Sequence, residues 1–174
     1  MPREIELKIH LEDPRGFLGR LKNVAQAEGA YYKVDTYFRG PEGSFRLRES
    51  NGRPVVCRKE KSIEAGVEVN LETEFQIDDS YSFRKFSLSL GYQEWYRKEK
   101  IGQTWRWGEI LIEEGEVSSL GWFAEFELIV DEQAGEEAIL RARESLYAAL
   151  ESLEVPKSLI EARTYSQLLG HRGK

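Results

Sequence analysis

The segment Glu4-Ile5-Glu6-Leu7-Lys8 carries the residue types most able to do chemistry. In an extended strand, successive side chains point to opposite faces, so two carboxylates and an ammonium group share one face and the apolar side chains share the other. Three ionised groups on one face need either bulk water or a highly charged partner. Carboxylate oxygens are the ligands that Mg²⁺ and Mn²⁺ prefer. The segment therefore predicts either a solvated strand face or a site for metal and a polyanion.

Two later segments repeat this alternation. Phe45-Arg46-Leu47-Arg48 alternates cations with apolar residues, and Glu125-Phe126-Glu127-Leu128 alternates carboxylates with them. Arginine side chains bind phosphate oxygens through two hydrogen bonds, whereas lysine acts more as a point charge. For any single strand, the solvated face of an antiparallel sheet is the commoner explanation. A sheet assembled from several such strands would have one apolar face and one ionic face.

Glycine, proline and aspartate residues at short intervals divide the chain into short elements. We predict strands over residues 31–39, 44–50, 54–61, 66–77, 93–101, 104–114 and 122–131. Asn51-Gly52 is a strong signal for a hairpin, and Ala65-Gly66 marks a second turn.

Helices are predicted in three places. The first begins at Asp13-Pro14, which supply an N-cap and a proline in the first helical position, and continues to Gly29. A second begins at about Asp79, and a last helical region covers about 135–169 with a break near Pro156.

Strands joined mostly by hairpins favour an antiparallel sheet that closes on itself. The predicted fold class is α+β, with a closed antiparallel β-barrel, a charged lumen and helices packed outside, in a single domain over residues 1–174. Ile5, Leu7 and Ile9 would then point outward against the helices. Such an inverted barrel requires a lumen that holds water, ions and a polyanion.

Charge and cysteine content exclude some classes of function. A net charge of −6 disfavours general attraction to nucleic acid or to anionic membranes, so any anion site must be a local cluster of basic residues. The single cysteine, Cys57, cannot form an internal disulfide, and no signal-peptide pattern precedes the first strand, so we predict a cytoplasmic protein. No apolar stretch approaches the ~20 residues that span a bilayer.

Taken together and in this order, the charged segments resemble the CYTH family of triphosphate tunnel metalloenzymes, which includes class IV adenylyl cyclases and thiamine triphosphatases. The resemblance covers nearly the whole chain. Besides the segments above, it rests on Asp35-Thr36-Tyr37-Phe38, Leu120-Gly121-Trp122-Phe123-Ala124-Glu125 and Arg163-Thr164-Tyr165-Ser166-Gln167-Leu168-Leu169. The family's fold is the barrel predicted here, with the ionic lumen as the triphosphate tunnel.

The resemblance also implies roles for individual residues. The implied ligands of Mg²⁺ or Mn²⁺ are Glu4, Glu6, Glu125 and Glu127, with Glu113 as a replacement for a family aspartate. The implied phosphate-binding residues are Lys8, Arg46, Arg48, Lys59 and Lys100, with Lys98 added as a replacement, and Lys8 and Lys59 are also the predicted catalytic residues. Glu72 and Glu74 occupy a further Glu-x-Glu position and either support the site or form a solvated face.

Three positions depart from the family pattern. Asn70 and Gly102 stand where arginines are expected, and Gly115 stands where an aspartate is expected. Either binding of one phosphate is weaker, or Lys98 and Glu113 compensate, since each shares a strand face with the position concerned. In the first case, Asn70→Arg with Gly102→Arg should tighten triphosphate binding, and Gly115→Asp should increase turnover.

The first functional hypothesis is metal-dependent hydrolysis of tripolyphosphate, thiamine triphosphate or ATP. The alternatives are a class IV adenylyl cyclase that converts ATP to cyclic AMP and diphosphate, and a non-catalytic polyphosphate or nucleotide binding module. The predicted partner is a small-molecule triphosphate, without nucleic acid or membrane, and both a monomer and a homodimer are left open.

The remaining candidate residues carry weaker signals. Four tryptophans either stack on a base or thiazolium ring at a tunnel mouth or pack in the core: Trp95, Trp105, Trp107 and Trp122. His10 and His171 have no cysteine partners and give little support to a zinc site. Cys57 has no histidine partner and is predicted to be a small core residue.

Overall fold

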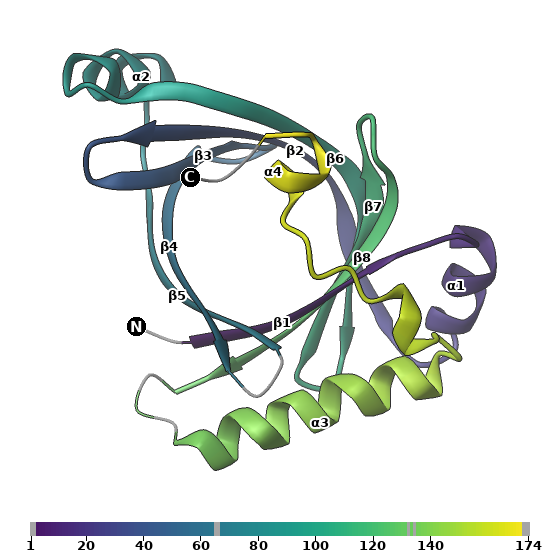
Figure 1. Ribbon diagram of the computed structural model, residues 1–174. Coiled ribbons are helices and arrows are strands. Elements are labelled where there is room, and N and C mark those ends of the chain that lie inside the picture. Colours follow the sequence, from purple (N-terminus) through teal and green to yellow (C-terminus); the bar gives the residue numbers. More distant parts are fainter. Residues whose placement is uncertain (1–2, 65–66, 132, 134, 172–174) are drawn as a thin grey trace.

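The computed structural model describes residues 3–64, 67–131, 133 and 135–171. Within these ranges, eight antiparallel strands close into a barrel in the order β1-β5-β4-β3-β2-β6-β7-β8 (Figure 1). The strands are β1 (Arg3–His10), β2 (Gln26–Gly40), β3 (Gly43–Glu49), β4 (Val55–Glu64), β5 (Val67–Gln76), β6 (Gln93–Trp107), β7 (Ile110–Val117) and β8 (Gly121–Val130). The predicted closed antiparallel barrel is confirmed.

The main hydrophobic core lies outside the barrel, as the alternation in β1 predicts. Ile5, Leu7 and Ile9 are buried with exposed fractions of 0%, 4% and 0%, and they share one cluster with Leu146 and Leu150 of helix α3 (Glu136–Ser152). Helix α3 runs along the outside of β8 and β1 (Figure 1). Because the apolar faces are covered from outside, the charged faces of the same strands line the interior.

Short helices complete the fold. They are α1 (Pro14–Leu21), α2 (Ser80–Ser89), a 3₁₀ turn (Lys157–Leu159) and α4 (Tyr165–Leu168). Asp13 caps α1 by accepting a hydrogen bond from the Gly16 amide, and Asp79 caps α2 in the same way from the amides of Tyr81 and Ser82. These caps stand where the sequence places them, since an aspartate side chain satisfies amides that the first helical turn leaves unpaired. None of the helices in the described ranges is long and apolar enough to cross a bilayer.

The predicted extent of the first helix is wrong. Helix α1 ends at Leu21, and β2 begins at Gln26 instead of residue 31. From Gln26 onward the backbone pairs with β6, starting opposite Arg106. This long-range pairing satisfies the backbone polar groups of the segment and overrides its local helical spacing.

The predicted break between residues 101 and 104 is also wrong, because β6 is continuous from Gln93 to Trp107 and turns only at Gly108, whose φ is +59°. The Asn51-Gly52 hairpin is confirmed, with a longer loop, since β3 ends at Glu49 and β4 begins at Val55. The Ala65-Gly66 turn lies outside the described residues.

The break near Pro156 is confirmed, but helix α3 already ends at Ser152, so the region up to 169 is not one helix. Only the short 3₁₀ turn and α4 are helical beyond the break.

Candidate active site

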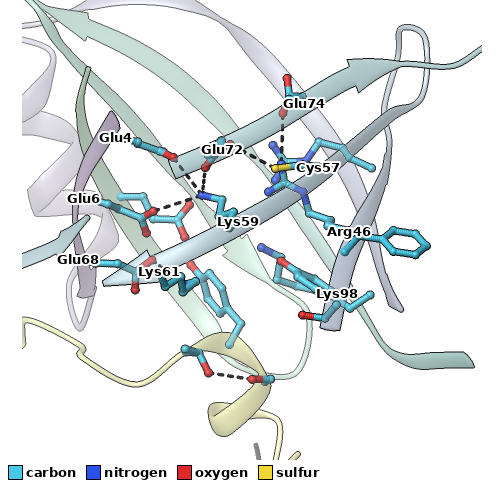
Figure 2. Close-up of a pocket in the computed structure, with 18 of the residues that line it drawn as sticks. Glu4, Glu6, Arg46, Cys57, Lys59, Lys61, Glu68, Glu72, Glu74 and Lys98 are labelled. Atoms are coloured by element: carbon cyan, nitrogen blue, oxygen red, sulfur yellow. Dashed lines mark hydrogen bonds and ion pairs between the residues drawn. The ribbon is translucent and has the colours of Figure 1, made fainter. Parts of the chain in front are cut away.

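The interior of the barrel contains a cavity of about 680 Å³, a size typical of small-molecule sites. Its wall comes from all eight strands and from Thr164, Tyr165 and Ser166 near the C-terminus. Ten of the eleven predicted site residues line it: Glu4, Glu6, Lys8, Arg46, Arg48, Lys59, Lys98, Glu113, Glu125 and Glu127. Figure 2 shows how acidic and basic side chains from different strands point toward one another across this space.

Three carboxylates converge at one place in the cavity. Oxygens of Glu4, Glu6 and Glu127 lie within 4.8 Å of one another, because Glu4 and Glu6 share a face of β1 and Glu127 on β8 pairs directly with Glu6. Burial, a hydrogen bond with Glu72 and the charge of Glu127 raise the pKa of Glu4 to about 10. Burial and the charge of Glu6 raise the pKa of Glu127 to about 8. We call Glu4, Glu6 and Glu127 the carboxylate triad.

The donor set of the triad fits a hard divalent cation. Three carboxylate oxygens are the ligand type of Mg²⁺ and Mn²⁺, and a divalent charge would offset both the burial and the mutual repulsion that raise the pKa of Glu4 and Glu127. Water molecules and further carboxylates usually complete the coordination of such an ion. The predicted ligands Glu125 and Glu113 are not part of this group.

Lys59 on β4 is the cation nearest to the triad. Its ammonium group lies 3.1 Å from Glu4 and 3.9 Å from Glu6, and it also forms an ion pair with Glu72 (Figure 2). Burial lowers the pKa of Lys59, but the charges of Glu6, Glu4 and Glu72 outweigh burial and raise it. Glu72 has a pKa of about 2, lowered against burial by its hydrogen bonds with Glu4 and Lys59 and by the charge of Lys59. Lys59 is therefore always charged and anchors the acidic side of the cavity.

The two arginines of β3 have different surroundings. Arg48 donates hydrogen bonds of 2.7 and 3.0 Å to the two carboxylate oxygens of Asp35, which is completely buried and also lies 3.2 Å from Lys98. The guanidinium of Arg46 approaches Glu74 at 3.6 Å, and its Nε atom makes no hydrogen bond to any described residue. Arg46 is thus available to an anion in the cavity, whereas Arg48 is held by Asp35.

No family model matches the chain. A "putative adenylate cyclase" of Methanocaldococcus jannaschii is 24% identical, with 96% of this chain and 98% of that protein covered. A solved structure of a "putative adenylate cyclase" from Vibrio parahaemolyticus superposes with a TM-score of 0.81 at 24% identity, over 96% of this chain and 97% of the other.

The chain has the same fold as the Vibrio protein, in agreement with the resemblance of its charged segments. A solved structure from Hippeastrum, described as a "putative adenylyl cyclase" with a dominant triphosphatase activity, has the same fold. Its TM-score is 0.68 at 16% identity, with 100% of this chain and 98% of that chain covered. The cavity described above is accordingly the interior of a barrel whose fold these proteins share.

Lys100 is the one predicted site residue that does not line the cavity inside the barrel. Its side chain is buried, 2.6 Å from Glu125 and 3.6 Å from Glu113, and Tyr31 lies beside it. Glu113 also forms an ion pair with Lys33. Lys100 is thus enclosed by Glu125 and Glu113 and holds both in place. Both carboxylates form ion pairs with lysines in this structure.

The departures at Gly102 and Gly115 have a steric cause. The two glycines face each other across β6 and β7, and the hydroxyl of Tyr31 lies above both, donating to the Glu114 carbonyl at 3.0 Å. A Cβ atom at Gly102 would lie 2.0 Å from that carbonyl oxygen, and one at Gly115 would lie 2.5 Å from the Ile101 carbonyl oxygen. The backbone and Tyr31 fill the space that an arginine or aspartate side chain would need at these two positions, which speaks against the first of the two alternatives, a weaker site that such residues would improve.

Gly102→Arg is expected to destabilise the protein and not to tighten anion binding. Overpacking at a tight backbone contact costs at least about 1–3 kcal/mol, which corresponds to a fall in melting temperature of roughly 2–12 °C in a chain of this size. Gly19→Arg is the matched control, since nothing lies within 4 Å of a Cβ at that exposed helical position. Thermal unfolding of both variants checks this, and a stable Gly102→Arg protein with tighter tripolyphosphate binding would contradict it.

Asn70, the third departure, is completely buried and does not line the cavity. Its amide donates a hydrogen bond of 3.0 Å to Glu68. Glu68 and Lys61, which form an ion pair with each other, do line the cavity and were not among the predicted residues. Lys61 follows Lys59 by two positions and Glu68 precedes Glu72 by four, so period-two alternation was the signal that could have found them.

Glu72 supports the site through Lys59, whereas Glu74 is half exposed on the cavity wall. Asp35, which the sequence analysis uses only for the resemblance, pairs with the cavity residues Arg48 and Lys98, and its alternation with Lys33 on one strand face is the signal that places it on the inner side of the strand. Cys57 is buried, donates to Glu72 at 3.3 Å and forms part of the cavity wall, and burial raises the pKa of its thiol to about 12.

Trp95 alone of the four tryptophans lines the cavity, whereas Trp105, Trp107 and Trp122 belong to or pack against the main core. The pairing of β2 with β6 shifts register between Tyr37 and Phe38, which leaves Trp95 as an extra residue in a β-bulge. A bulge redirects a side chain, and here Trp95 and its neighbour Tyr96 both reach the cavity.

Proposed function

We propose that this protein is a divalent-metal-dependent phosphohydrolase that acts on inorganic triphosphate or a small organic triphosphate inside the tunnel. The observation that carries the proposal is the carboxylate triad, which shares one cavity with the cations Lys8, Arg46, Lys59 and Lys98. A site of this kind suits a ligand that combines a metal ion with a chain of phosphates. The dominant triphosphatase activity stated for the Hippeastrum protein supports the choice of hydrolysis.

In the proposed reaction, Glu4, Glu6 and Glu127 would hold Mg²⁺ or Mn²⁺. When bound, the metal ion supplies Lewis-acid chemistry at the phosphoryl group and makes water a better nucleophile. Arg46, whose Nε atom makes no hydrogen bond with a described residue, binds a phosphate oxygen through its guanidinium group. Lys8 and Lys59 stabilise the negative charge that develops on the phosphoryl and leaving oxygens, which preorganised cations do without reorganising during the step.

A second candidate is the adenylyl cyclase reaction, in which the ribose hydroxyl of ATP attacks the α-phosphorus. The observation that favours it is Trp95, which the bulge brings to the cavity wall and whose ring can stack on a purine. The names of the Methanocaldococcus and Vibrio proteins agree with this candidate. Both reactions use the same triad and cations.

One experiment distinguishes these activities. The purified protein is incubated with tripolyphosphate, thiamine triphosphate or ATP, each with Mg²⁺ or Mn²⁺, and phosphate, diphosphate and cyclic AMP are measured together. Phosphate release is the expected result. Cyclic AMP with diphosphate would favour the second candidate, and binding without turnover would contradict both and favour a binding module. We further propose that the chain acts as a single domain in the cytoplasm, where Cys57 stays a free thiol.

Arg46→Ala is expected to weaken tripolyphosphate binding much more than Arg48→Ala. Loss of a charge-assisted hydrogen bond costs about 1.5–3 kcal/mol, or roughly 10-fold to 150-fold in affinity. Arg48→Ala should instead lower thermal stability, because it leaves buried Asp35 with Lys98 as its remaining cation. Calorimetry and thermal unfolding check both variants, with exposed Arg58→Ala as control. Equal losses of affinity for Arg46→Ala and Arg48→Ala would show that both arginines bind the anion.

A further inference from the structure

The segment from Glu161 to Ser166 crosses one opening of the barrel. The Glu161 amide donates to the Lys8 carbonyl at 2.8 Å, and Ile160 forms an isolated bridge with Ile9, so the segment is fixed to β1. Figure 1 shows it passing from α3 across the barrel opening to α4. Because Thr164, Tyr165 and Ser166 line the cavity, the C-terminal segment is part of the tunnel wall.

Tyr165 contacts two of the predicted phosphate-binding lysines at once. The Nζ atom of Lys8 lies 4.4 Å from the centre of its ring, and that of Lys98 lies 4.2 Å from it. Lys8 is on β1 and Lys98 is on β6, and β7 and β8 separate these strands in the barrel. A single ring thus joins cations from two strands that do not pair.

The electrostatics of this cluster are unusual. Lys8 forms no ion pair with any described residue, and its ammonium group donates a hydrogen bond of 2.5 Å to the carbonyl of Arg163. Lys98 is paired with Asp35. The face of an aromatic ring attracts cations, which offsets part of the repulsion between two ammonium groups on the same side of a cavity. Burial lowers the pKa of Lys8 against the charges of Glu125 and Glu6, which agrees with its weak pairing.

The hydroxyl of Tyr165 is a second notable feature. The side chain is buried, and by distance and angle its hydroxyl makes no hydrogen bond with any described residue, although burial first, and then the close contact with the Glu125 carboxylate, raise its pKa. A buried hydroxyl without a hydrogen-bond partner is costly, and a ligand that accepts its hydrogen bond removes this cost. An anionic oxygen in the cavity is such an acceptor.

We propose that Tyr165 is a positioning residue of the phosphate site: its ring fixes the ammonium groups of Lys8 and Lys98 so that both bind one phosphate chain, and its hydroxyl donates to the same anion. This inference rests on the proposed function, because it names a further residue of that site. Under this proposal, the C-terminal segment contributes to phosphate binding in addition to packing against the barrel.

The test is the binding of tripolyphosphate to metal-free protein in the presence of a chelator, measured by calorimetry. The variants are Tyr165→Phe, Tyr165→Leu, Lys8→Met and the double variant Tyr165→Leu with Lys8→Met. We expect losses of affinity of about 3-fold for Tyr165→Phe and about 10-fold for Tyr165→Leu and for Lys8→Met, within the range of single contacts. The double variant should lose much less than the product of the two single losses, since neighbouring groups that act together are not additive.

The controls separate positioning from packing. Tyr147→Leu removes a tyrosine that contacts Lys157 outside the barrel and should leave binding unchanged. Tyr165→Met fills a similar volume without an aromatic face, must show the same loss as Tyr165→Leu, and replaces it if the leucine variant does not fold.

Wild-type affinity in the Tyr165→Leu or Tyr165→Met variant, or additive losses in the double variant, would overturn the inference alone. Failure of the wild-type protein to bind tripolyphosphate with or without Mg²⁺ would overturn the proposed function as well.

Discussion

Glu4→Gln is expected to abolish metal-dependent turnover while the protein stays folded. The substitution removes one charged oxygen of the carboxylate triad but almost no volume, so the loss should exceed the roughly 100-fold that the removal of an outer-shell partner of a metal site costs. The pKa of Glu4, raised to about 10, means that glutamine resembles the protonated side chain of the metal-free protein. The melting temperature without metal should therefore stay equal or rise.

Steady-state turnover as a function of Mg²⁺ concentration, together with thermal unfolding in a chelator, measures both effects. Glu6→Gln should behave in the same way. Glu60→Gln is the matched control, because Glu60 is an exposed strand residue whose ion pair within the described residues is with exposed Arg58. Unchanged turnover of Glu4→Gln at saturating Mg²⁺ would remove Glu4 from the metal site.

Asp35→Asn is expected to have the largest effect on stability. Asp35 is completely buried between Arg48 and Lys98, so the variant leaves the buried Lys98 and the partly buried Arg48 without their shared carboxylate. Breaking a buried ion pair from one side costs about 3–5 kcal/mol. In a chain of this size the melting temperature should fall by roughly 6–20 °C. Asp78→Asn, at an exposed ion pair with Arg53, should change it little.

The difference in stability between the wild type and Asp35→Asn should depend on pH in a definite direction. Burial raises the pKa of Asp35, but Lys98 and Arg48 outweigh burial and lower it below the unfolded value of 3.8. A carboxyl with a lowered pKa contributes stability above the unfolded value and loses it as the pH falls toward the folded value. The difference in free energy of unfolding between wild type and Asp35→Asn should thus be largest at neutral pH and become smaller below pH 3.8. A gap that widens on acidification would contradict this assignment of the charge.

Much of the fold follows from local pattern. Alternation in Glu4-Ile5-Glu6-Leu7-Lys8 separates the side chains into two faces whatever the strand later pairs with, because the side-chain period of a strand is two residues. The caps Asp13 and Asp79 act within one helical turn, so their helix starts were predictable. Where long-range pairing competes with local preference, prediction failed: residues 26–30 joined β2, and Gly102 proved to be a close contact inside β6.

By itself, the sequence determined which side chains share the interior and that this interior is ionic, since strand periodicity and charge alternation are local properties. Only the tertiary structure decided how these charges are divided. It grouped Glu127 with Glu4 and Glu6 but gave Glu125 to Lys100, and it tied Arg48 to Asp35 while it left Arg46 available. These choices depend on strand register and on distances between strands remote in the chain, which closure of the barrel sets and no local pattern contains.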